Sequence, residues 1–332
     1  MIQCMTTYLA TIDGTQEDIS IKSSDIRELY IGFDEDLPLN EIYAFDDPIR
    51  LSMSRIDRYN LTLHKYIFTR HIEILRIYGQ ALDIMTDFTF MTNLKHIHIG
   101  NSYHSFITDY FSKPLTHFAF PLALESLHIY DHIDTDILLD MVLPINLKEL
   151  TIFCDYKFPI TSVTFNKNLK KLYLHSFSDI TIPETIIHLG IRSLRDCQNL
   201  HKIEIPSTVK TLHIDLYTHE IDNILSSIKI PSNIIWLAIS YITLLKHLIF
   251  ESNIKKLEIY DDDYIASLND LPYGIEKLVL HRTYIIEDIT NLPMSLQKIK
   301  IIEDPECILS RIKKLPYGCI VVDKHNNIIM KN

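Results

Sequence analysis

At 332 residues the chain could hold one or two domains, and its 47% hydrophobic and 23% charged residues are typical of a globular protein rather than a disordered one. The formal net charge of −11 argues against a nucleic-acid partner, because proteins that bind polyanions usually present a basic surface. The five cysteines include no C-x-x-C pair, so neither a disulfide framework nor a zinc site is predicted. A reducing compartment is expected instead.

The first residues, 1–14, contain no basic region followed by an apolar run, so no secretory signal is predicted. The most apolar stretch, Ile234 to Leu245, is 12 residues long, whereas about 18 are needed to cross a bilayer. We therefore expect an intracellular, cytoplasmic protein that is monomeric and has no membrane partner.

The chain begins with a predicted hairpin. Two β-prone runs between Thr6 and Ile21 flank Asp13-Gly14, a dipeptide that favours a tight turn because both of its residues tolerate positive φ. A repeat array needs an atypical terminal element to cover its apolar end. Residues 1–22 are therefore predicted to form an N-terminal capping hairpin.

An internal repeat follows, and its most complete copy is Ile228 to Ile239. The pattern is φ-x-φ-P-x-x-φ-x-x-L-x-φ, where φ is a large aliphatic or aromatic residue; it returns in full or in part between Phe118 and Ile301 and in degenerate form between Ile26 and Ile99. The last three anchors, Leu257, Leu278 and Ile299, are 21 residues apart, within the range of about 20 to 29 that leucine-rich repeats show. Residues 23–317 are predicted to be repeats of a single domain, 1–332.

The L-x-φ pair at the end of each copy has the alternation of a β-strand. Successive copies can stack in parallel and bury their aliphatic pairs in one continuous core. The proline has no N–H to donate and should turn the chain toward the strand. We predict an α/β repeat solenoid: a curved, leucine-rich-repeat-like array with a parallel β-sheet on the concave face and irregular turns and short helices on the convex face.

Short helices are predicted at three places on the opposite wall. Asp304-Pro305-Glu306 provides an N-cap, a proline at the first helical position and an acidic first turn, and residues 307–313 continue with helical spacing. Helical spacing also occurs at 221–228 and 136–142. At the end of the chain, two β-prone runs flank Asp323 to Asn327, so residues 318–332 are predicted to form a C-terminal capping hairpin.

The P-x-x-φ-x-x-L-x-φ unit resembles the leucine-rich-repeat proteins of the FNIP type, which occur in social amoebae and in giant DNA viruses of amoebae. The resemblance covers roughly residues 115 to 320, and the family's Phe-Asn-x-Pro element is represented only by Phe165-Asn166 and Phe120-Pro121. It implies a protein-interaction module that is not an enzyme, in the host cytoplasm if the protein is viral.

Some FNIP-type proteins carry an F-box, a short helical module that recruits a ubiquitin ligase. Leu37 to Ile42 is weakly similar to the start of an F-box, although the residues after it return to the strand pattern. The first alternative is therefore a substrate receptor of a ubiquitin ligase, with helices over residues 34 to 70. The second alternative is a metal-binding protein or an enzyme.

The residues that flank the anchor leucine should face away from the core, and many of them are histidine or aromatic. They are His96, His98, His128, Tyr130, Tyr173, His175, His188, His213, Trp236, Tyr260 and His281. Rigid amphipathic rings on an exposed sheet are what protein interfaces use as anchors, so these positions are the candidate partner-binding residues. The alternative is that such residues simply favour exposed strand positions.

Other patterns carry weaker functional signals. His96, His98 and His128 have no carboxylate at a convincing ligand position beside them, so no metal or other cofactor is predicted. The chain has no phosphate loop, GxGxxG, HExxH or GxSxG motif. Four lysines, Lys256, Lys277, Lys298 and Lys300, should share one face. They could steer an acidic partner, but the preferred interpretation is that they keep the sheet soluble and discourage unwanted strand pairing.

Overall fold

The computed structural model divides the chain into two compact units. The first contains residues Met1–Lys170 and His175–Ser178, and the second contains Lys171–Leu174 and Asp179–Asn332. The residues that the structure describes are 9–11, 28–31, 50–52, 73–77, 88–89, 91–99, 119–133, 142–154, 164–175, 181–193, 204–216, 228–240, 245, 248–250, 254–260, 264–265, 267–281 and 284–332.

The first unit is built on parallel strands that follow one another in chain order. They are β2 (Glu28–Ile31), β4 (Ile74–Ile77), β5 (His96–Ile99), β6 (Ser126–Ile133) and β7 (Glu149–Cys154). The register aligns the anchors, so that Leu75 pairs with Ile97, Ile97 with Leu127, and Leu127 with Leu150. A separate parallel pair joins β1 (Leu9–Thr11) to β3 (Arg50–Ser52).

The second unit repeats this arrangement and carries most of β8 (Lys171–His175). The strands after it in the sheet are β9 (His188–Ser193), β10 (Thr211–Leu216), β12 (Trp236–Ile239), β14 (Lys256–Ile259), β16 (Lys277–Leu280), β18 (Lys298–Ile301), β19 (Ile320–Val322) and β20 (Ile328–Lys331). Two short parallel pairs lie outside the sheet, β11 (Ile228–Ile230) with β13 (Leu248–Phe250) and β15 (Tyr264–Ile265) with β17 (Tyr284–Ile285). The predicted repeat solenoid is confirmed.

The core is a ladder of the anchor positions. Every described residue at the two apolar positions of L-x-φ, from Ile97 to Ile301, is no more than 4% exposed. In the most complete copy, Ile230, Ile234, Leu237 and Ile239 are all buried, as the repeat pattern predicts. Because each copy covers the next, burial of these aliphatic side chains is the main favourable term holding the stack together.

The prolines act through their carbonyl groups. In most copies the proline carbonyl accepts a hydrogen bond from the backbone N–H three residues later, as between Pro121 and Leu124 (3.1 Å) and between Pro293 and Leu296 (2.9 Å). This bond closes a β-turn that delivers the chain into the strand. In Pro316-Tyr317-Gly318 the third position has a φ of 77°, which glycine adopts without steric cost.

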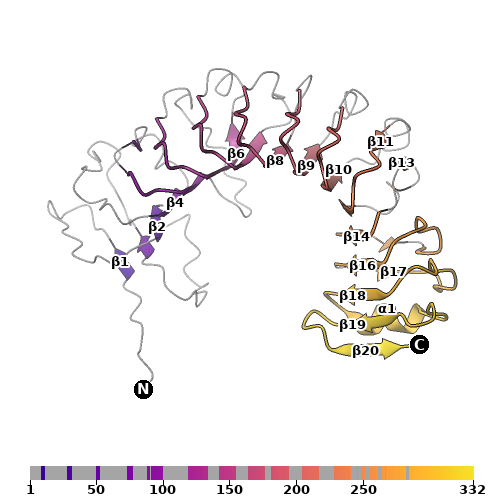
Figure 1. The fold of residues 1–332 in the computed structure, drawn as a ribbon. Helices are drawn as coiled ribbons and strands as arrows, with labels where there is room; N and C mark the ends of the chain where they lie inside the picture. The colour runs from indigo at the N-terminus through magenta and orange to yellow at the C-terminus, as the bar shows by residue number, and fades with distance from the viewer. Residues whose placement is uncertain are drawn as a thin grey trace. The chain divides into compact units, whose positions relative to one another are not determined.

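The wall opposite the sheet contains a single short helix among the described residues, α1 (Pro305–Arg311). Figure 1 shows β17 and α1 beside the ladder formed by β14, β16 and β18. Pro305 and Glu306 lie in the first turn as predicted, but Asp304 has a φ of 46° and its side chain makes no capping hydrogen bond. Asp304 therefore occupies the predicted N-cap position, but in a left-handed backbone conformation and without the side-chain hydrogen bond that a capping aspartate usually makes.

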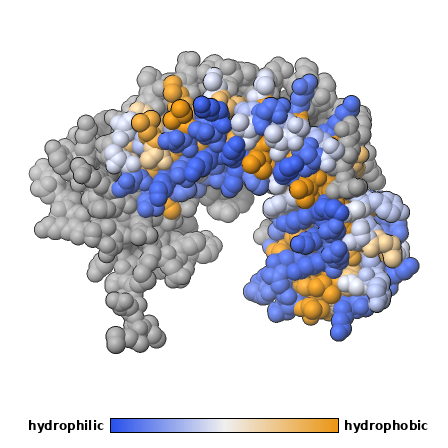
Figure 2. All heavy atoms as spheres, viewed as in Figure 1, coloured by the Kyte–Doolittle hydropathy of each residue, from blue (hydrophilic) through white to orange (hydrophobic). Residues whose placement is uncertain are grey.

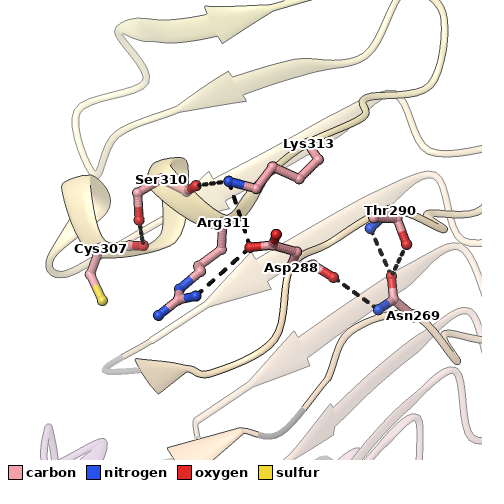
Figure 3. Close-up of polar contacts among 7 residues, drawn as sticks. All are labelled: Asn269, Asp288, Thr290, Cys307, Ser310, Arg311 and Lys313. Atoms are coloured by element: carbon pink, nitrogen blue, oxygen red, sulfur yellow. Dashed lines mark hydrogen bonds and ion pairs between the residues drawn. The ribbon is translucent and has the colours of Figure 1, made fainter.

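Ion pairs and side-chain hydrogen bonds attach the helix to its neighbours (Figure 3). Arg311 and Lys313 both approach the carboxylate of Asp288, at 3.7 Å and 3.6 Å. The Lys313 ammonium also donates to the Ser310 carbonyl at 2.9 Å, where lysine satisfies a free carbonyl at the end of the helix.

The two predicted capping hairpins differ in how much of them is described. Strands β19 and β20 pair antiparallel, while the other side of β19 pairs in parallel with β18. Near the N-terminus only Leu9–Thr11 is described, and the Asp13-Gly14 turn lies outside the described residues. Most of the predicted helices at 136–142 and 221–228 and most of residues 34 to 70 also lie outside them; within these ranges Ile228 and Arg50–Ser52 belong to strands.

Candidate functional site

The candidate site lies on one side of the sheet, which we call the open face. It carries the residues on either side of each anchor leucine, whose side chains point away from the core because side chains alternate along a strand. The predicted partner-binding residues whose side chains the structure describes occupy this face. The backbones of Tyr130 and His175 are described in β6 and β8, but their side chains lie outside the described part of the structure.

A buried carboxylate organises the open face of the second unit. Glu258, in β14, is only 6% exposed although it points away from the aliphatic core. Its oxygens receive three partners: the Lys256 ammonium at 2.8 Å, His281 Nε2 at 2.8 Å and the Tyr260 hydroxyl at 2.8 Å. We call these four residues, together with His213 and Trp236, the Glu258 cluster.

Trp236 and Lys256 are neighbours across two strands. They are paired in register between β12 and β14, and the Lys256 ammonium lies 3.5 Å from the centre of the Trp236 ring, which is a cation–π contact. The indole Nε1 is buried and makes no hydrogen bond to a described residue. The lysine therefore links the only tryptophan of the chain to the carboxylate of Glu258.

Three rings of the cluster stack along the open face. Tyr260 lies against His281 with ring centres 4.2 Å apart and against His213 with centres 5.4 Å apart. Such offset contacts contribute roughly 0.5 to 1.5 kcal/mol beyond burial alone. The stack joins β10 to the residues that directly follow β14 and β16, so residues distant in sequence hold one another in a fixed arrangement.

Small residues make room for the large rings. A Cβ atom placed on Gly190 would lie 2.1 Å from the Tyr173 ring, so this ring covers the glycine of the neighbouring strand. Ala238 occupies the equivalent position in β12, in register with His213, and is 4% exposed. The alternation of large and small residues from strand to strand lets the rings lie flat on the sheet.

A second polar group lies at the ends of the neighbouring strands. Arg192 forms an ion pair with Asp215 at 3.0 Å, and Ser240 donates a hydrogen bond to the same carboxylate. The Arg192, Asp215 and Ser240 side chains come from β9, β10 and the residue after β12. The open face of the second unit thus carries two carboxylates, each held by donors from other strands.

The environment shifts the protonation of three members of the cluster. The hydrogen bonds from His281, Lys256 and Tyr260 outweigh burial and lower the pKa of Glu258 from 4.5 to about 2. Burial lowers the pKa of His213, although Asp215 and Glu258 oppose this change. Burial and the carboxylate of Glu258 raise the pKa of Tyr260. At neutral pH Glu258 is therefore charged and Tyr260 is a hydrogen-bond donor.

The open face of the first unit carries a smaller histidine pair. His98 and His128 are in register on β5 and β6 and stack with ring centres 4.4 Å apart. The two nitrogens of His128 lie 2.6 Å from the Ser126 hydroxyl and 2.9 Å from the Thr151 hydroxyl. Neither nitrogen can bind a metal without first breaking one of these hydrogen bonds.

The arrangement around the histidines has no metal-binding character within the described ranges. No three His, Cys, Asp or Glu side chains there gather closely enough to hold an ion. No helix in the same ranges is long and apolar enough to cross a membrane. Of the predicted partner-binding residues, the structure joins His213, Trp236, Tyr260 and His281 in one cluster, places Tyr173 on the same open face in β8, and puts His98 and His128 in another pair.

Several polar residues of the open face were not among the predicted site residues. Glu258, Asp215 and Arg192 occupy the same alternating positions as the predicted histidines, so the strand pattern could have identified them as facing outward. Rings are typical interface anchors, whereas carboxylates are depleted at interface cores. Their burial depends on cross-strand partners some 20 residues away in sequence, which the pattern of a single copy does not reveal.

Comparison with known proteins identifies the repeat. The family described as the BspA-type leucine-rich repeat region, in six copies, matches residues 65–180, 110–214 and 173–261. These overlapping matches cover more than half of the chain. Neither the curated proteins nor the solved structures with which the chain was compared give a match.

This match supports the predicted leucine-rich-repeat architecture. It does not support the predicted FNIP type or an origin in amoebae or giant viruses. The match is to a repeat family and not to a catalytic one. The chain belongs to the BspA-type leucine-rich repeat family.

Proposed function

We propose that this protein is a non-enzymatic protein-interaction module and that the Glu258 cluster on the open face of the second unit is its binding surface. Repeat solenoids offer extended surfaces of this kind, on which side chains from successive repeats form one continuous site. The partner is a protein, because the surface is a broad array of rings and charges, as at protein interfaces.

The observation that carries the proposal is the fixed arrangement of rings from separate strands. Trp236, His213 and Tyr260 are each held by a neighbour: Trp236 by Lys256, and the other two by ring stacking. Association costs free energy for every side chain that it immobilises, about 0.5 to 1.5 kcal/mol for a flexible one. A surface whose rings are already ordered avoids much of this cost.

The charges of the cluster also suit a binding surface. Glu258 is fully paired by its own neighbours, so a partner does not have to neutralise it on binding. Tyrosine and tryptophan are enriched among the residues that contribute most to interface affinity. The rings and not the carboxylate are therefore the expected anchors.

The test is a triple substitution, Trp236→Ala, Tyr260→Ala and His213→Ala, used as bait in cross-linked affinity capture from the source cells. Loss of three anchors should reduce the amount of captured partner by at least about tenfold. Circular dichroism and the thermal midpoint establish that the variant is folded, since the anchors of the core are untouched.

A matched control removes similar bulk from another exposed site. Tyr273, Met294 and Tyr317 are 88%, 73% and 91% exposed and lie on the turns that precede β16, β18 and β19. Their replacement by alanine should leave capture unchanged. If the control variant loses the partner while the triple variant keeps it, the binding surface is on the turns and the proposal is wrong.

A further inference from the structure

The chemistry of the partner follows from the lysines beside the Glu258 cluster, an inference that rests on the proposed function. Trp236, Lys256, Lys277 and Lys298 are aligned in register across four neighbouring parallel strands. Lys300 lies two residues after Lys298, on the same side of β18. Figure 2 shows hydrophilic residues gathered over β14 to β18 in this region.

The row places like charges directly opposite one another, which is destabilising in a sheet. Lys256 is compensated by Glu258 and by the ring of Trp236, and Lys298 donates a hydrogen bond to Asn326 at 3.2 Å. The side chains of Lys277 and Lys300 form no ion pair or hydrogen bond with any residue that the structure describes. The unfolded chain would separate these charges, so the folded protein keeps them together at a cost.

A role in protecting a sheet edge does not explain the lysines. Lysine discourages unwanted pairing where a strand has a free edge. Here β16 pairs with β14 and β18, and β18 pairs with β16 and β19, so Lys277, Lys298 and Lys300 all lie on strands bonded on both sides. Of the interpretation preferred from the sequence alone, in which the lysines keep the sheet soluble and discourage unwanted strand pairing, the second part therefore does not apply to these strands.

Nearby carboxylates do not neutralise Lys277, Lys298 and Lys300. Glu258 is already bound by Lys256, His281 and Tyr260, and Glu276 pairs with Lys255 at 2.7 Å at the beginning of the strands. A local positive surface on a chain with a net charge of −11 favours a negatively charged ligand at this place and disfavours it elsewhere. A nucleic acid is the weaker candidate, because its binding normally engages many more basic groups.

We propose that the partner docks an acidic peptide segment on Lys277, Lys298 and Lys300, next to the ring of Trp236. The carboxylates of the segment would lie over the lysine row and relieve its like-charge repulsion. The neighbouring apolar part of the partner would contact the Glu258 cluster. Charge complementarity would thus select the partner, and the rings would provide most of the affinity.

The chain contains its own reporter, because Trp236 is its only tryptophan and is in register with the lysine row. A short polyglutamate peptide should change Trp236 fluorescence in a saturable, salt-sensitive way, and a glycine-serine peptide of equal length should not. The double variant Lys277→Glu and Lys300→Glu should weaken polyglutamate binding by about tenfold or more.

The matched control is Lys167→Glu with Lys170→Glu, which changes the net charge equally at two exposed lysines of the first unit. It should bind polyglutamate as the wild type does. Equal binding by the wild type and the Lys277/Lys300 variant would overturn the proposal. Tighter binding of a single-stranded oligonucleotide to the same lysines would overturn the choice of a peptide, and a fluorescence change with protein concentration alone would indicate a second copy instead.

Partner capture separates this proposal from the proposed function. If the Lys277/Lys300 variant keeps the captured partner while the Trp236/Tyr260/His213 variant loses it, the binding surface stands and the acidic segment is wrong. If both variants keep the partner, both proposals are wrong. Loss of capture in both variants, with the Lys167/Lys170 control unaffected, supports both.

Discussion

Glu258 shows how a single residue can be buried on the exposed side of a sheet. Its side chain is 8% exposed because Lys256, Tyr260 and His281 close over it. A buried charge is costly unless it is paired and hydrogen-bonded, and here both oxygens have partners. Burial raises the pKa of the carboxyl group and the donors lower it, and the donors prevail.

The lowered pKa of Glu258 predicts an acid-dependent loss of stability. A carboxyl group whose pKa falls from 4.5 to about 2 on folding stabilises the folded state above pH 4.5, and this contribution disappears as the pH falls toward 2. At pH 7 the free energy of unfolding of the Glu258→Gln variant, measured by urea titration, should therefore be lower than that of the wild type by up to about 3 kcal/mol. The difference should shrink at pH 3.

Glu276→Gln is the control for this prediction, because Glu276 forms an exposed ion pair with Lys255 and should cost less than about 1 kcal/mol at pH 7. The lowered pKa of His213 also makes the protein less stable in acid, and because Glu258 opposes that lowering, both Glu258 forms are compared in a His213→Ala background. A difference between wild type and Glu258→Gln that stayed constant from pH 7 to pH 3 would show that the charge of Glu258 is not what stabilises the cluster.

At the scale of the element, asparagine side chains join one turn of the solenoid to the next. Asn146 donates to the Leu122 carbonyl at 2.9 Å, and Asn166 donates to the Pro144 carbonyl at 2.7 Å. Among the described asparagines, Asn269 makes the most such bonds: its Oδ1 accepts from the backbone N–H groups of Thr290 at 2.8 Å and Asn291 at 2.9 Å. The turns lack strand pairing, so these side chains supply the hydrogen bonds that the backbone needs.

Asn269→Ala should lower the free energy of unfolding by about 1 to 3 kcal/mol. The substitution leaves the N–H groups of Thr290 and Asn291 and the Asp288 carbonyl without their partner. Figure 3 shows the contacts of Asn269 with Thr290 and Asp288. Urea unfolding followed by circular dichroism measures the change.

Asn291→Ala removes one bond, from its amide to the Asn269 carbonyl, and should cost no more than about 1 kcal/mol. Equal effects of the two substitutions would mean that water replaces the Asn269 contacts without loss.

At the scale of the whole molecule, hydrogen bonding within the main sheet is local. Inside each unit, a described strand bonds only to the strands of the preceding and following copies. Leu127, for example, pairs with Ile97 on one side and Leu150 on the other. In such an array the stability is close to a sum of repeat terms and nearest-neighbour terms. A local defect should therefore stay local, within either of the two compact units.

Leu127→Ala tests this locality. Removing a fully buried leucine costs about 2 to 5 kcal/mol, which should speed amide hydrogen exchange by more than about tenfold in β5, β6 and β7. Exchange in β16 and β18 should be unchanged. The reciprocal variant, Leu278→Ala, should affect β14, β16 and β18 and leave β6 unchanged; faster exchange throughout the chain in either variant would contradict the nearest-neighbour description.

The repeat architecture could be predicted from the sequence because it is encoded locally and many times over. Proline, the buried aliphatic residue and the L-x-φ strand recur at nearly fixed distances, and each copy specifies its own turn and the inward side of its own strand. The same alternation predicted which side chains point outward, from His96 to His281. Local periodicity is sufficient for these features because they depend on only a few consecutive residues.

The contacts on the open face were decided only by the tertiary structure. Whether Lys256 meets Trp236, whether Tyr260 lies between His213 and His281, and whether Gly190 accepts the ring of Tyr173 all depend on the register between copies about 20 residues apart. A shift of one residue in any copy would move these side chains to the other face. The sequence by itself determined the repeat and the two faces of the sheet; stacking of the repeats decided which outward residues meet, because their partners come from other turns.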